Sequence, residues 1–319
     1  MARPIATVDV PASSANLGSG FDCFAVALSL KLRAELHIGA EAGITVAAQG
    51  EGSAEAEADG ERSPVATAFR EGLRAAGGWT GGSGSWRIEV SSMIPAARGL
   101  GSSAAAIVAG LLLGASVGRR AVEPDELLGL AAWVEGHPDN VAAALYGGFT
   151  LAMLGRHLTG GPAPVTVRRF RAPEGWIPVL FIPQGQSKTA EMRAALPARI
   201  PHADAAAQAA RSALLTTAIL TADAGLLREA MDDRIHQPYR LTLLPGSAES
   251  IDLAYQCGAA GACLSGAGPA VLAICDSPLT AHAVEKAWNG LGSAGRPGMA
   301  TRLRFDEAGA RLTTADARR

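Results

Sequence analysis

A glycine-rich turn stands directly in front of a long run of small and apolar residues: "RGLGSS" at positions 98–103 precedes "AAAIVAGLLLGA" at 104–115. Glycines let backbone N–H groups come close to an anion, and the N-terminus of the following helix also favours negative charge. The pattern therefore predicts a phosphate-binding turn at the start of a helix over 103–117. The lysine of the ordinary P-loop motif is missing, so such a cradle is of a different kind. A plain helix cap built from serines is the alternative that the turn by itself leaves open.

Composition favours a compact protein that acts on a small molecule. The 319 residues are 48% hydrophobic and 18% charged, which suits two domains with adjoining cores. The formal net charge of −2 gives no basic surface for nucleic acid, and no polybasic or amphipathic stretch indicates a membrane surface. Two long apolar stretches, 104–118 and 258–275, are too short or too interrupted for membrane spans, so we expect buried core elements. The four cysteines form no C-x-x-C pair and no signal peptide precedes them, so we expect reduced thiols in a cytoplasmic protein.

The order of the expected elements indicates an α+β protein of two parts. A glycine- and proline-rich stretch near 155–164 is the best boundary, and it divides the chain into residues 1–160 and 161–319. We expect the first part to hold strands at 6–10, 30–38 and 85–90, loops at 11–22 and 51–62 (the second acidic and solvated), and helices at 64–76, 103–117 and from Pro124 onward. The second part is expected to hold strands at 165–171, 177–182 and 299–305, helices between 188 and 232 and at 247–256 and 279–290, a strand-turn-strand at 262–275, and a frayed end, "TTADARR". This order is a split β-α-β arrangement.

Four stretches resemble the motifs of one family. "IPAARGLGSSAA" (94–105) resembles the phosphate-binding motif of the GHMP kinases, and "LSGAGPAVLA" (264–273) resembles their third, glycine-rich motif. "VPASSANLGSGFDCFAVAL" (10–28) and "EGHPDNVAAALYGG" (135–148) resemble the substrate and central motifs of the homoserine kinase family among them. The resemblance implies a two-domain GHMP kinase fold, with an N-terminal β/α domain that carries the phosphate loop and a C-terminal ferredoxin-like split β-α-β domain. It also implies ATP and L-homoserine as substrates, Mg²⁺ as cofactor, and a homodimer.

The resemblance assigns the nucleotide end of the site as well. Residues 95–104 are expected to wrap the phosphates of ATP, while Ser103 and Glu135 hold Mg²⁺, a hard cation that prefers oxygen ligands. For Glu135 the alternative is a surface carboxylate at the end of a helix. The helix around 62–71 is expected to border the adenine, although this chain reads "RSPVATAFRE" where many members have Asn-Leu, so the adenine contacts stay open. The expected nucleotide-binding residues are Pro95, Ala96, Ala97, Arg98, Gly99, Leu100, Gly101, Ser102, Ser103 and Ala104.

The two charged ends of L-homoserine need partners of opposite sign. By resemblance, Asp22 pairs with the ammonium group, and Arg193 and Arg240 hold the carboxylate, for which a bidentate guanidinium is the natural match. The assignment of Arg240 is better supported than that of Arg193, because Arg240 directly follows "HQPY". The alternative for Arg193 is a solvated helix residue.

The reacting hydroxyl is assigned to Asn16 and Asn140, with His137 and Asp139 beside Asn140 in the substrate-binding set. For His137, which stands beside a proline, the alternative is a residue of the turn or one that supports its neighbours. Alternatively, "SANLGSGFD" is only a turn rich in loop-forming residues. Phosphoryl transfer mainly needs alignment and charge compensation, so direct passage of the hydroxyl proton to the γ-phosphate is favoured over Asp139 as a general base. The expected catalytic residues are Asn16, Asp22, Asn140 and Arg240.

The resemblance thus implies ATP-dependent phosphorylation of L-homoserine to O-phospho-L-homoserine, a step of threonine biosynthesis. Two alternatives stay open: another GHMP kinase that acts on a different small alcohol, and a non-catalytic sensor on the same scaffold. The charged pair Asp22 and Arg240 argues against an uncharged sugar, and the metal ligands Ser103 and Glu135 argue against a sensor. A serine hydrolase is excluded because neither serine-glycine site fits the G-x-S-x-G elbow.

Overall fold

The computed structural model describes residues 3–79, 84–155, 162–295 and 297–315. Its strands are β1 (Ala6–Asn16), β2 (Gly20–Ile38), β3 (Gly43–Gly50), β4 (Ser85–Ser92), β5 (Phe149–Leu154), β6 (Val165–Phe170), β7 (Ile177–Pro183), β8 (Gly261–Leu264), β9 (Val271–Cys275), β10 (Gly298–Arg302) and β11 (Arg311–Thr314). Its α-helices are α1 (Ser53–Asp59), α2 (Pro64–Ala75), α3 (Ser102–Ser116), α4 (Pro124–Glu135), α5 (Asp139–Tyr146), α6 (Thr189–Ala194), α7 (His202–Thr221), α8 (Leu227–Ala230), α9 (Gln237–Leu243), α10 (Pro245–Gln256) and α11 (Pro278–Gly290).

Two β-sheets organise this described part of the chain. The seven-stranded sheet has the order β11-β1-β2-β4-β3, with β5 paired to β2 and β6 paired to β5. The four-stranded sheet has the order β10-β7-β9-β8. The mixture of helices and sheets confirms the expected α+β class. None of the helices within the described residues has the length and hydrophobicity of a membrane span.

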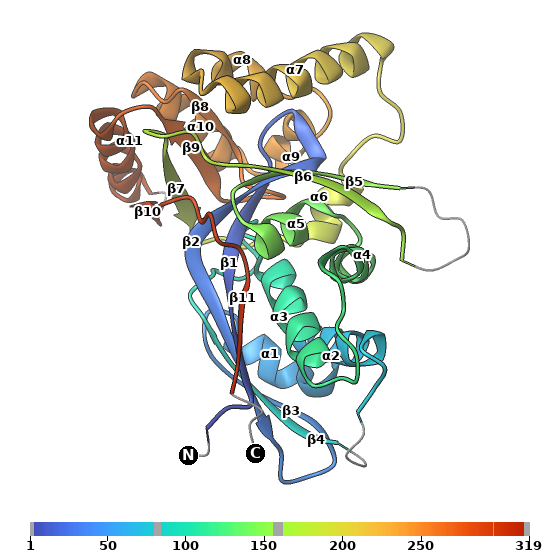
Figure 1. Ribbon diagram of the computed structural model, residues 1–319. Coiled ribbons are helices and arrows are strands. Elements are labelled where there is room, and N and C mark those ends of the chain that lie inside the picture. Colours follow the sequence, from blue (N-terminus) through green and yellow to red (C-terminus); the bar gives the residue numbers. More distant parts are fainter. Residues whose placement is uncertain (1–2, 80–83, 156–161, 296, 316–319) are drawn as a thin grey trace.

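Helices cover one face of the larger sheet. Alternate residues between Leu32 and Leu36 of β2 are buried, as in a strand with one face in the core. Figure 1 shows α2, α3, α4 and α5 together on one side of β1 and β2. Two glycines let α3 approach α2 closely, because a Cβ at Gly110 or at Gly114 would lie 2.2 or 2.1 Å from a backbone oxygen of α2. This packing fixes α3, and with it the glycine-rich turn at its N-terminus, against the sheet.

The smaller sheet packs against α10 and α11, which lie beside it in Figure 1. Every residue of β8 and β9 is buried, which explains their apolar sequences. Trp288 of α11 is fully buried, and its indole N–H donates to the Ser250 carbonyl of α10 at 2.9 Å. The strand-turn-strand and the two helices that were expected here are confirmed, with ends shifted by at most two residues.

Two expectations for the first part of the chain are wrong. Residues 51–62 are not a loop throughout, since they form α1 and a 3₁₀ turn (Gly60–Arg62). Carboxylates hold this segment to the edge strand β3: Glu57 accepts from the Ala48 N–H at 3.0 Å, and Glu61 from the Ile44 N–H at 3.3 Å. Residues 11–16, expected as a loop, continue β1, because their partners on β2 continue as well.

Two expectations for the second part need correction. The strand expected at 165–171 is confirmed as β6, but it pairs with β5 in the larger sheet instead of joining the smaller one. Part of the supposedly frayed end is β11, whose Thr313 and Thr314 pair with Thr7 and Ala6 of β1. Residues 316–319 of that end lie outside the described residues.

The expected boundary near 155–164 falls largely on residues 156–161, which lie outside the described residues. The division into 1–160 and 161–319 therefore stays a prediction. Strands β6 and β11 follow this point in the sequence and still belong to the larger sheet. The structure also contains β3, β5, α5 and α9, for which the sequence patterns gave no separate expectation.

Candidate active site

The glycine-rich turn before α3 needs glycine at two positions. Gly99 and Gly101 have φ angles of +76° and +68°, in the left-handed region that disfavours side chains. A Cβ at Gly99 would lie 2.0 Å from the Ser265 carbonyl oxygen, and one at Gly101 would lie 2.1 Å from Ser13 Oγ. The turn is therefore closely enclosed by two other stretches of the chain.

Short hydrogen bonds join these stretches. The Ser13 N–H donates to the Leu100 carbonyl at 3.1 Å, and Ser13 Oγ donates to Asn140 Oδ1 at 2.8 Å. From the other side, Ser265 Oγ lies 2.7 Å from the Gly99 carbonyl, to which it donates. The four sequence motifs thus meet at one place, although 235 residues lie between the end of the first (10–28) and the start of the last (264–273).

A cleft of about 320 Å³ opens at this meeting point. Of the predicted nucleotide-binding residues, Pro95, Ala96, Arg98 and Ala104 do not line it. Arg98 instead donates to three backbone carbonyls, those of Ala96, Pro183 and Gln184, which tie the turn to the end of β7. The predicted residues that line the cleft are Asn16, Asp22, Ala97, Gly99, Leu100, Gly101, Ser102, Ser103, Glu135, His137, Asp139, Asn140, Arg193 and Arg240.

Ser103 and Glu135 place two oxygen donors together at the start of α3. Ser103 Oγ donates to Glu135 Oε2 at 2.7 Å, and the Glu135 side chain, at the end of α4, is only 12% exposed. Burial raises the pKa of Glu135, since a carboxylate in this position lacks the solvation it has in water. A hydroxyl beside a buried carboxylate is a donor set that suits a hard divalent cation.

His137 and Asp139 form a close pair beside these groups. His137 Nδ1 lies 2.6 Å from Asp139 Oδ1, which also accepts the Asn140 N–H at 2.7 Å. Burial by itself would lower the pKa of His137, but the hydrogen bond to Asp139 and the charges of Asp139 and Glu135 outweigh it and raise the pKa to about 9. Near neutral pH the imidazole is therefore positively charged, and Asp139 is already engaged.

The loop that carries Asn16 and Asp22 is strongly constrained. Asn16 Nδ2 donates to the Gly266 carbonyl at 2.9 Å, and Asn16 Oδ1 accepts the Asp22 N–H at 3.1 Å. Both Asn16 and Asp22 have positive φ angles, +71° and +55°, which are uncommon for residues with side chains. Backbone conformations of this kind gather at functional sites, where the surrounding structure holds them.

Two arginines approach this loop from different helices. Arg193 on α6 forms a bidentate ion pair with Asp22, with distances of 2.7 and 2.8 Å, so it is bound to the cleft although its side chain is 43% exposed. Arg240 on α9 is 2% exposed and donates to the Gly266 carbonyl at 3.1 Å. Among the described residues no carboxylate forms an ion pair with Arg240, and its buried Nε has no hydrogen-bond partner. Burial lowers the pKa of Arg240, and such a buried cation is costly unless an anion joins it.

Sequence reasoning assigned no role to Phe21 and His236, which the structure places beside the arginines of the cleft. The Phe21 ring contacts both arginines, with its centroid 5.5 Å from Arg193 Cζ and 5.3 Å from Arg240 Cζ. His236 is buried beneath the same ring. Phe21 stands next to Asp22 in "GFD", and His236 stands four residues before Arg240 in "HQPYR". Their positions within these motifs were the sequence signal that could have pointed to them.

A second, mainly apolar pocket of about 250 Å³ adjoins the first. It shares Ala97, Ser102 and Ser103 with the cleft and extends to Pro64 and Val65 at the start of α2. The glycine-rich turn therefore borders both the cleft and this mainly apolar pocket.

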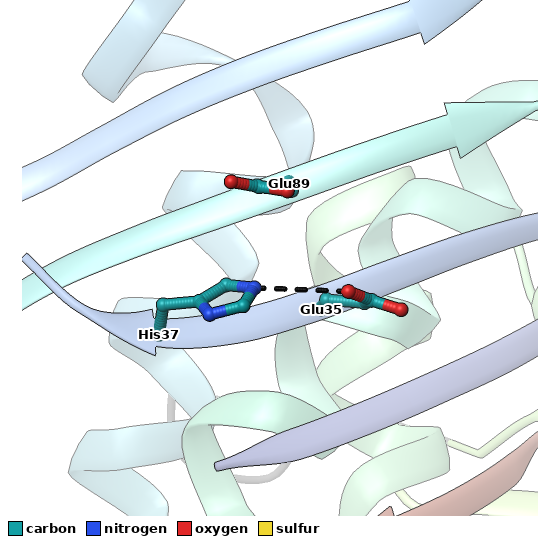
Figure 2. Close-up of side chains that lie close together, drawn as sticks. All are labelled: Glu35, His37 and Glu89. Atoms are coloured by element: carbon teal, nitrogen blue, oxygen red, sulfur yellow. Dashed lines mark ion pairs between the residues drawn. The ribbon is translucent and has the colours of Figure 1, made fainter. Parts of the chain in front are cut away.

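Another group that could bind a metal lies on the open face of the larger sheet (Figure 2). Ligand atoms of Glu35, His37 and Glu89 lie within 4.8 Å of one another, and Glu35 stands directly opposite Glu89 across β2 and β4. Each carboxylate already has a cation: Arg33 Nε is 3.0 Å from Glu35, and Arg87 Nε is 2.9 Å from Glu89. The dashed line in Figure 2 joins His37 Nε2 to Glu35 Oε2 at 3.7 Å. These pairs balance two like charges across the strands, and we assign the group to sheet stability.

Comparison with known proteins identifies similar chains. Family models described as GHMP kinases N terminal domain and GHMP kinases C terminal match residues 64–148 and 215–294. A homoserine kinase of Thermus thermophilus is 39% identical over 265 residues, 83% of this chain and 85% of that protein. A homoserine kinase of Streptomyces avermitilis is 40% identical over 308 residues, 95% of this chain and 94% of that protein. The crystal structure of homoserine kinase from Cytophaga hutchinsonii is similar at a TM-score of 0.83 and 26% identity, over 98% of this chain and 99% of that chain.

Proposed function

The chain belongs to the homoserine kinases of the GHMP kinase family, and from that premise we propose that its cleft transfers the γ-phosphoryl group of ATP to the side-chain hydroxyl of L-homoserine. The product is O-phospho-L-homoserine, and the reaction is a step of threonine biosynthesis. One observation carries the proposal: a glycine turn at a helix N-terminus shares its cleft with charged groups of both signs, Asp22 and Arg240. The turn suits a phosphate chain, and the charges suit the two ends of an α-amino acid.

We assign ATP to the turn and the apolar pocket beside it. The backbone N–H groups of Gly99 to Ser103 and the N-terminus of α3 offer donors and partial positive charge to the phosphates. The adenine then occupies the pocket that reaches Pro64 and Val65. The turn itself has no lysine of the ordinary P-loop kind and offers backbone donors instead, while Lys188 lines the same cleft.

We assign Mg²⁺ to Ser103 and Glu135. Their 2.7 Å contact and the burial of the carboxylate support this assignment, since both offer oxygen ligands to a cation at the phosphate end of the cleft. When bound, the ion would offset negative charge on the phosphates of ATP. The residues themselves anchor that position to α3 and α4, which pack against each other in the core.

We assign L-homoserine to the other end of the cleft. Asp22 would take the ammonium group, while Arg240 and Arg193 would take the carboxylate. Arg240 supports this placement most strongly, because its buried guanidinium has no carboxylate partner among the described residues. The Asp22–Arg193 pair would open so that each partner binds one charged end of the substrate.

Alignment of the reacting hydroxyl falls to Asn140 and Asn16. Asn140 Oδ1 accepts a hydrogen bond from Ser13 Oγ. The Nδ2 group of Asn140 can therefore donate to another acceptor, such as the substrate hydroxyl. Asp139 Oδ1 already contacts the charged His137 and accepts the Asn140 N–H, so these contacts give Asp139 a structural role beside Asn140. Direct passage of the hydroxyl proton to the γ-phosphate therefore fits the arrangement better than general-base catalysis.

A coupled assay of ADP release with four acceptors tests this function: homoserine, mevalonate, galactose and shikimate. We expect turnover with homoserine to exceed that with each of the others by a large factor, because only homoserine carries both charges. Equal rates with mevalonate or galactose would overturn the assignment and leave a GHMP-type kinase of another alcohol. ATP binding without turnover of any acceptor would favour a non-catalytic sensor.

Three further assignments rest on the family. We propose that two copies of the chain form a homodimer, that the enzyme acts in the cytoplasm, and that residues 1–160 and 161–319 are its two domains. Light scattering on the purified protein distinguishes a dimer from a monomer. Limited proteolysis tests the boundary, because cleavage should concentrate near 155–164 if the two parts fold as units.

A further inference from the structure

His236 connects the substrate-binding loop to Arg240. It immediately precedes α9, and its side chain is completely buried. Its Nε2 lies 2.8 Å from the Gly18 carbonyl oxygen, and its Nδ1 lies 3.3 Å from Arg240 Nη1. A carbonyl oxygen only accepts and a guanidinium nitrogen only donates, so both contacts are satisfied by one form of the ring. That form is the neutral imidazole with its proton on Nε2.

The loop side of this connection is fixed. Gly18 has a φ angle of +74°, and a Cβ there would lie 1.9 Å from the Met231 carbonyl oxygen. The Phe21 ring stacks on the His236 ring with centroids 5.1 Å apart and an angle of 24° between the planes. The same Phe21 ring faces the Arg240 guanidinium. Loop, imidazole and guanidinium thus form one packed unit.

The backbone of His236 is also held in place. Asp233 accepts the N–H groups of His236 and Gln237 at 2.8 and 2.6 Å, and its other oxygen accepts from Gln208 Nε2 at 2.7 Å. This turn sets where the imidazole enters the core. Since Gln208 also donates to the Ser19 carbonyl at 2.7 Å, the turn and the substrate-binding loop share a partner on α7.

We propose that His236 is a positioning residue for the carboxylate of the amino-acid substrate: it accepts from Arg240 through Nδ1 and thereby fixes the guanidinium that binds the carboxylate. This inference rests on the proposed function. Within the part of the chain that the structure describes, the other groups that contact the Arg240 guanidinium are the Gly266 carbonyl and the Phe21 ring. Without the imidazole acceptor the guanidinium keeps its charge and loses its orientation, which weakens bidentate binding.

Two substitutions separate the two contacts of the ring. In His236→Asn the side-chain oxygen lies near the position of Nδ1, so an acceptor for Arg240 is kept while the Gly18 contact is lost. In His236→Gln the amide reaches the position of Nε2, so the donor to Gly18 is kept while the acceptor for Arg240 is lost. His282→Gln on the exposed face of α11 is the matched control.

We expect His236→Gln to raise KM for homoserine roughly 10- to 100-fold, the cost of losing one hydrogen bond to a charged group. KM for ATP should change little, because the phosphate turn is untouched. His236→Asn should raise KM for homoserine less than His236→Gln does, although it removes more of the ring. Dissociation constants for homoserine measured by calorimetry without ATP should follow the same order.

The pH dependence gives a readout that a purely structural role would not. The charged groups that face the ring are Arg240 on α9, Asp233 in the preceding turn and Asp22 on the loop. Burial, together with the charge of Arg240, lowers the pKa of His236, against the opposing effect of Asp233. Protonation on acidification would point a second donor at Arg240, so KM for homoserine in the wild type should rise at low pH. This rise should be weaker in His236→Asn.

Three results would overturn the inference. One is an equal rise in KM for homoserine in the Asn and Gln variants. Another is a rise in KM for ATP of the same size as that for homoserine. The third is a set of KM changes that simply follows the loss of melting temperature. If the wild-type chain does not phosphorylate homoserine at all, the proposed function fails, and this role of His236 fails with it.

Discussion

Asp22 and Arg193 hold each other through two hydrogen bonds, with Nη1 2.7 Å from Oδ2 and Nη2 2.8 Å from Oδ1. They come from distant parts of the sequence, and their side chains are 32% and 43% exposed. An ion pair with this exposure is only weakly stabilising, so a ligand can replace it. A zwitterion offers a new partner to each side chain, whereas a ligand with one charge leaves one of them unpaired.

Removal of the Asp22 charge should therefore damage homoserine binding selectively. We expect Asp22→Asn to raise KM for homoserine roughly 10- to 100-fold, because the ammonium group loses its charged partner. KM for ATP should stay close to the wild-type value. Steady-state kinetics with each substrate varied in turn provides the measurement, with Asp9→Asn, an aspartate of β1 whose side chain is 41% exposed, as the control. An unchanged KM for homoserine in Asp22→Asn would contradict the assignment.

Ser103 and Glu135 should determine how the reaction rate depends on the Mg²⁺ concentration. We expect Glu135→Gln and Ser103→Ala to raise the Mg²⁺ concentration for half-maximal rate by roughly 10- to 100-fold, a cost typical for weakened metal binding. A Mg²⁺ titration at saturating ATP and homoserine measures this. Glu123→Gln, an exposed position just before α4, should behave as the wild type. Wild-type Mg²⁺ dependence in both site variants would show that other residues hold the ion.

The glycine turn that we propose to bind the phosphates should not tolerate a side chain at Gly101. Gly101→Ala combines an unfavourable positive φ with a 2.1 Å clash against Ser13 Oγ. We expect it to lower the free energy of unfolding by about 1–3 kcal/mol and to weaken ATP binding, as measured by denaturation and calorimetry. Gly175→Ala is a matched control, because its φ is +84° but nothing lies within 4 Å of the added Cβ. If both variants bind ATP equally well, the close packing around Gly101 does not contribute to ATP binding.

The buried thiols should be unreactive. Burial raises the pKa of Cys263 to about 12 and that of Cys275 to about 12, so at pH 8 both remain protonated and poor nucleophiles. Cys23, half-buried in the substrate motif, has its pKa raised to about 11 by burial and by Asp139. Native treatment with iodoacetamide, followed by mass spectrometry, should leave these three unmodified and the activity intact. Rapid inactivation with modification of Cys23 would contradict this.

The sequence predicted the elements of the site better than their mutual contacts. Glycine spacing located the turn at Gly99 and Gly101 because backbone conformation is a local property. The ion pair of Asp22 with Arg193 was not foreseen, because it depends on how α6 packs over a loop that lies far away in sequence. His236 was missed for the same reason: nothing local shows which carbonyl its ring reaches.

The fold was likewise predicted well where it depends on local sequence and less well where it depends on long-range contacts. Helices α2 and α3 were predicted nearly to their ends, because local features define them: the Ser63 cap begins α2, and a glycine turn followed by an apolar run begins α3. The sheet that β6 joins and the existence of β11 were harder to predict, because a short strand is stabilised by the strand edge it pairs with. Both strands pair in the larger sheet. The short helix α1 depends on carboxylates that cap the edge of β3, a contact that no sequence pattern encodes.

The ratio of kcat/KM for homoserine to kcat/KM for 4-hydroxybutyrate tests the central claim most directly. The two acceptors share the hydroxyl and the carboxylate, and only homoserine has the ammonium group that Asp22 is proposed to bind. We predict a ratio that approaches ~10⁴, because a site built to pair a polar group rejects an analogue that lacks it. Comparable values for the two acceptors would contradict the account, since the cleft would then not recognise an α-amino acid.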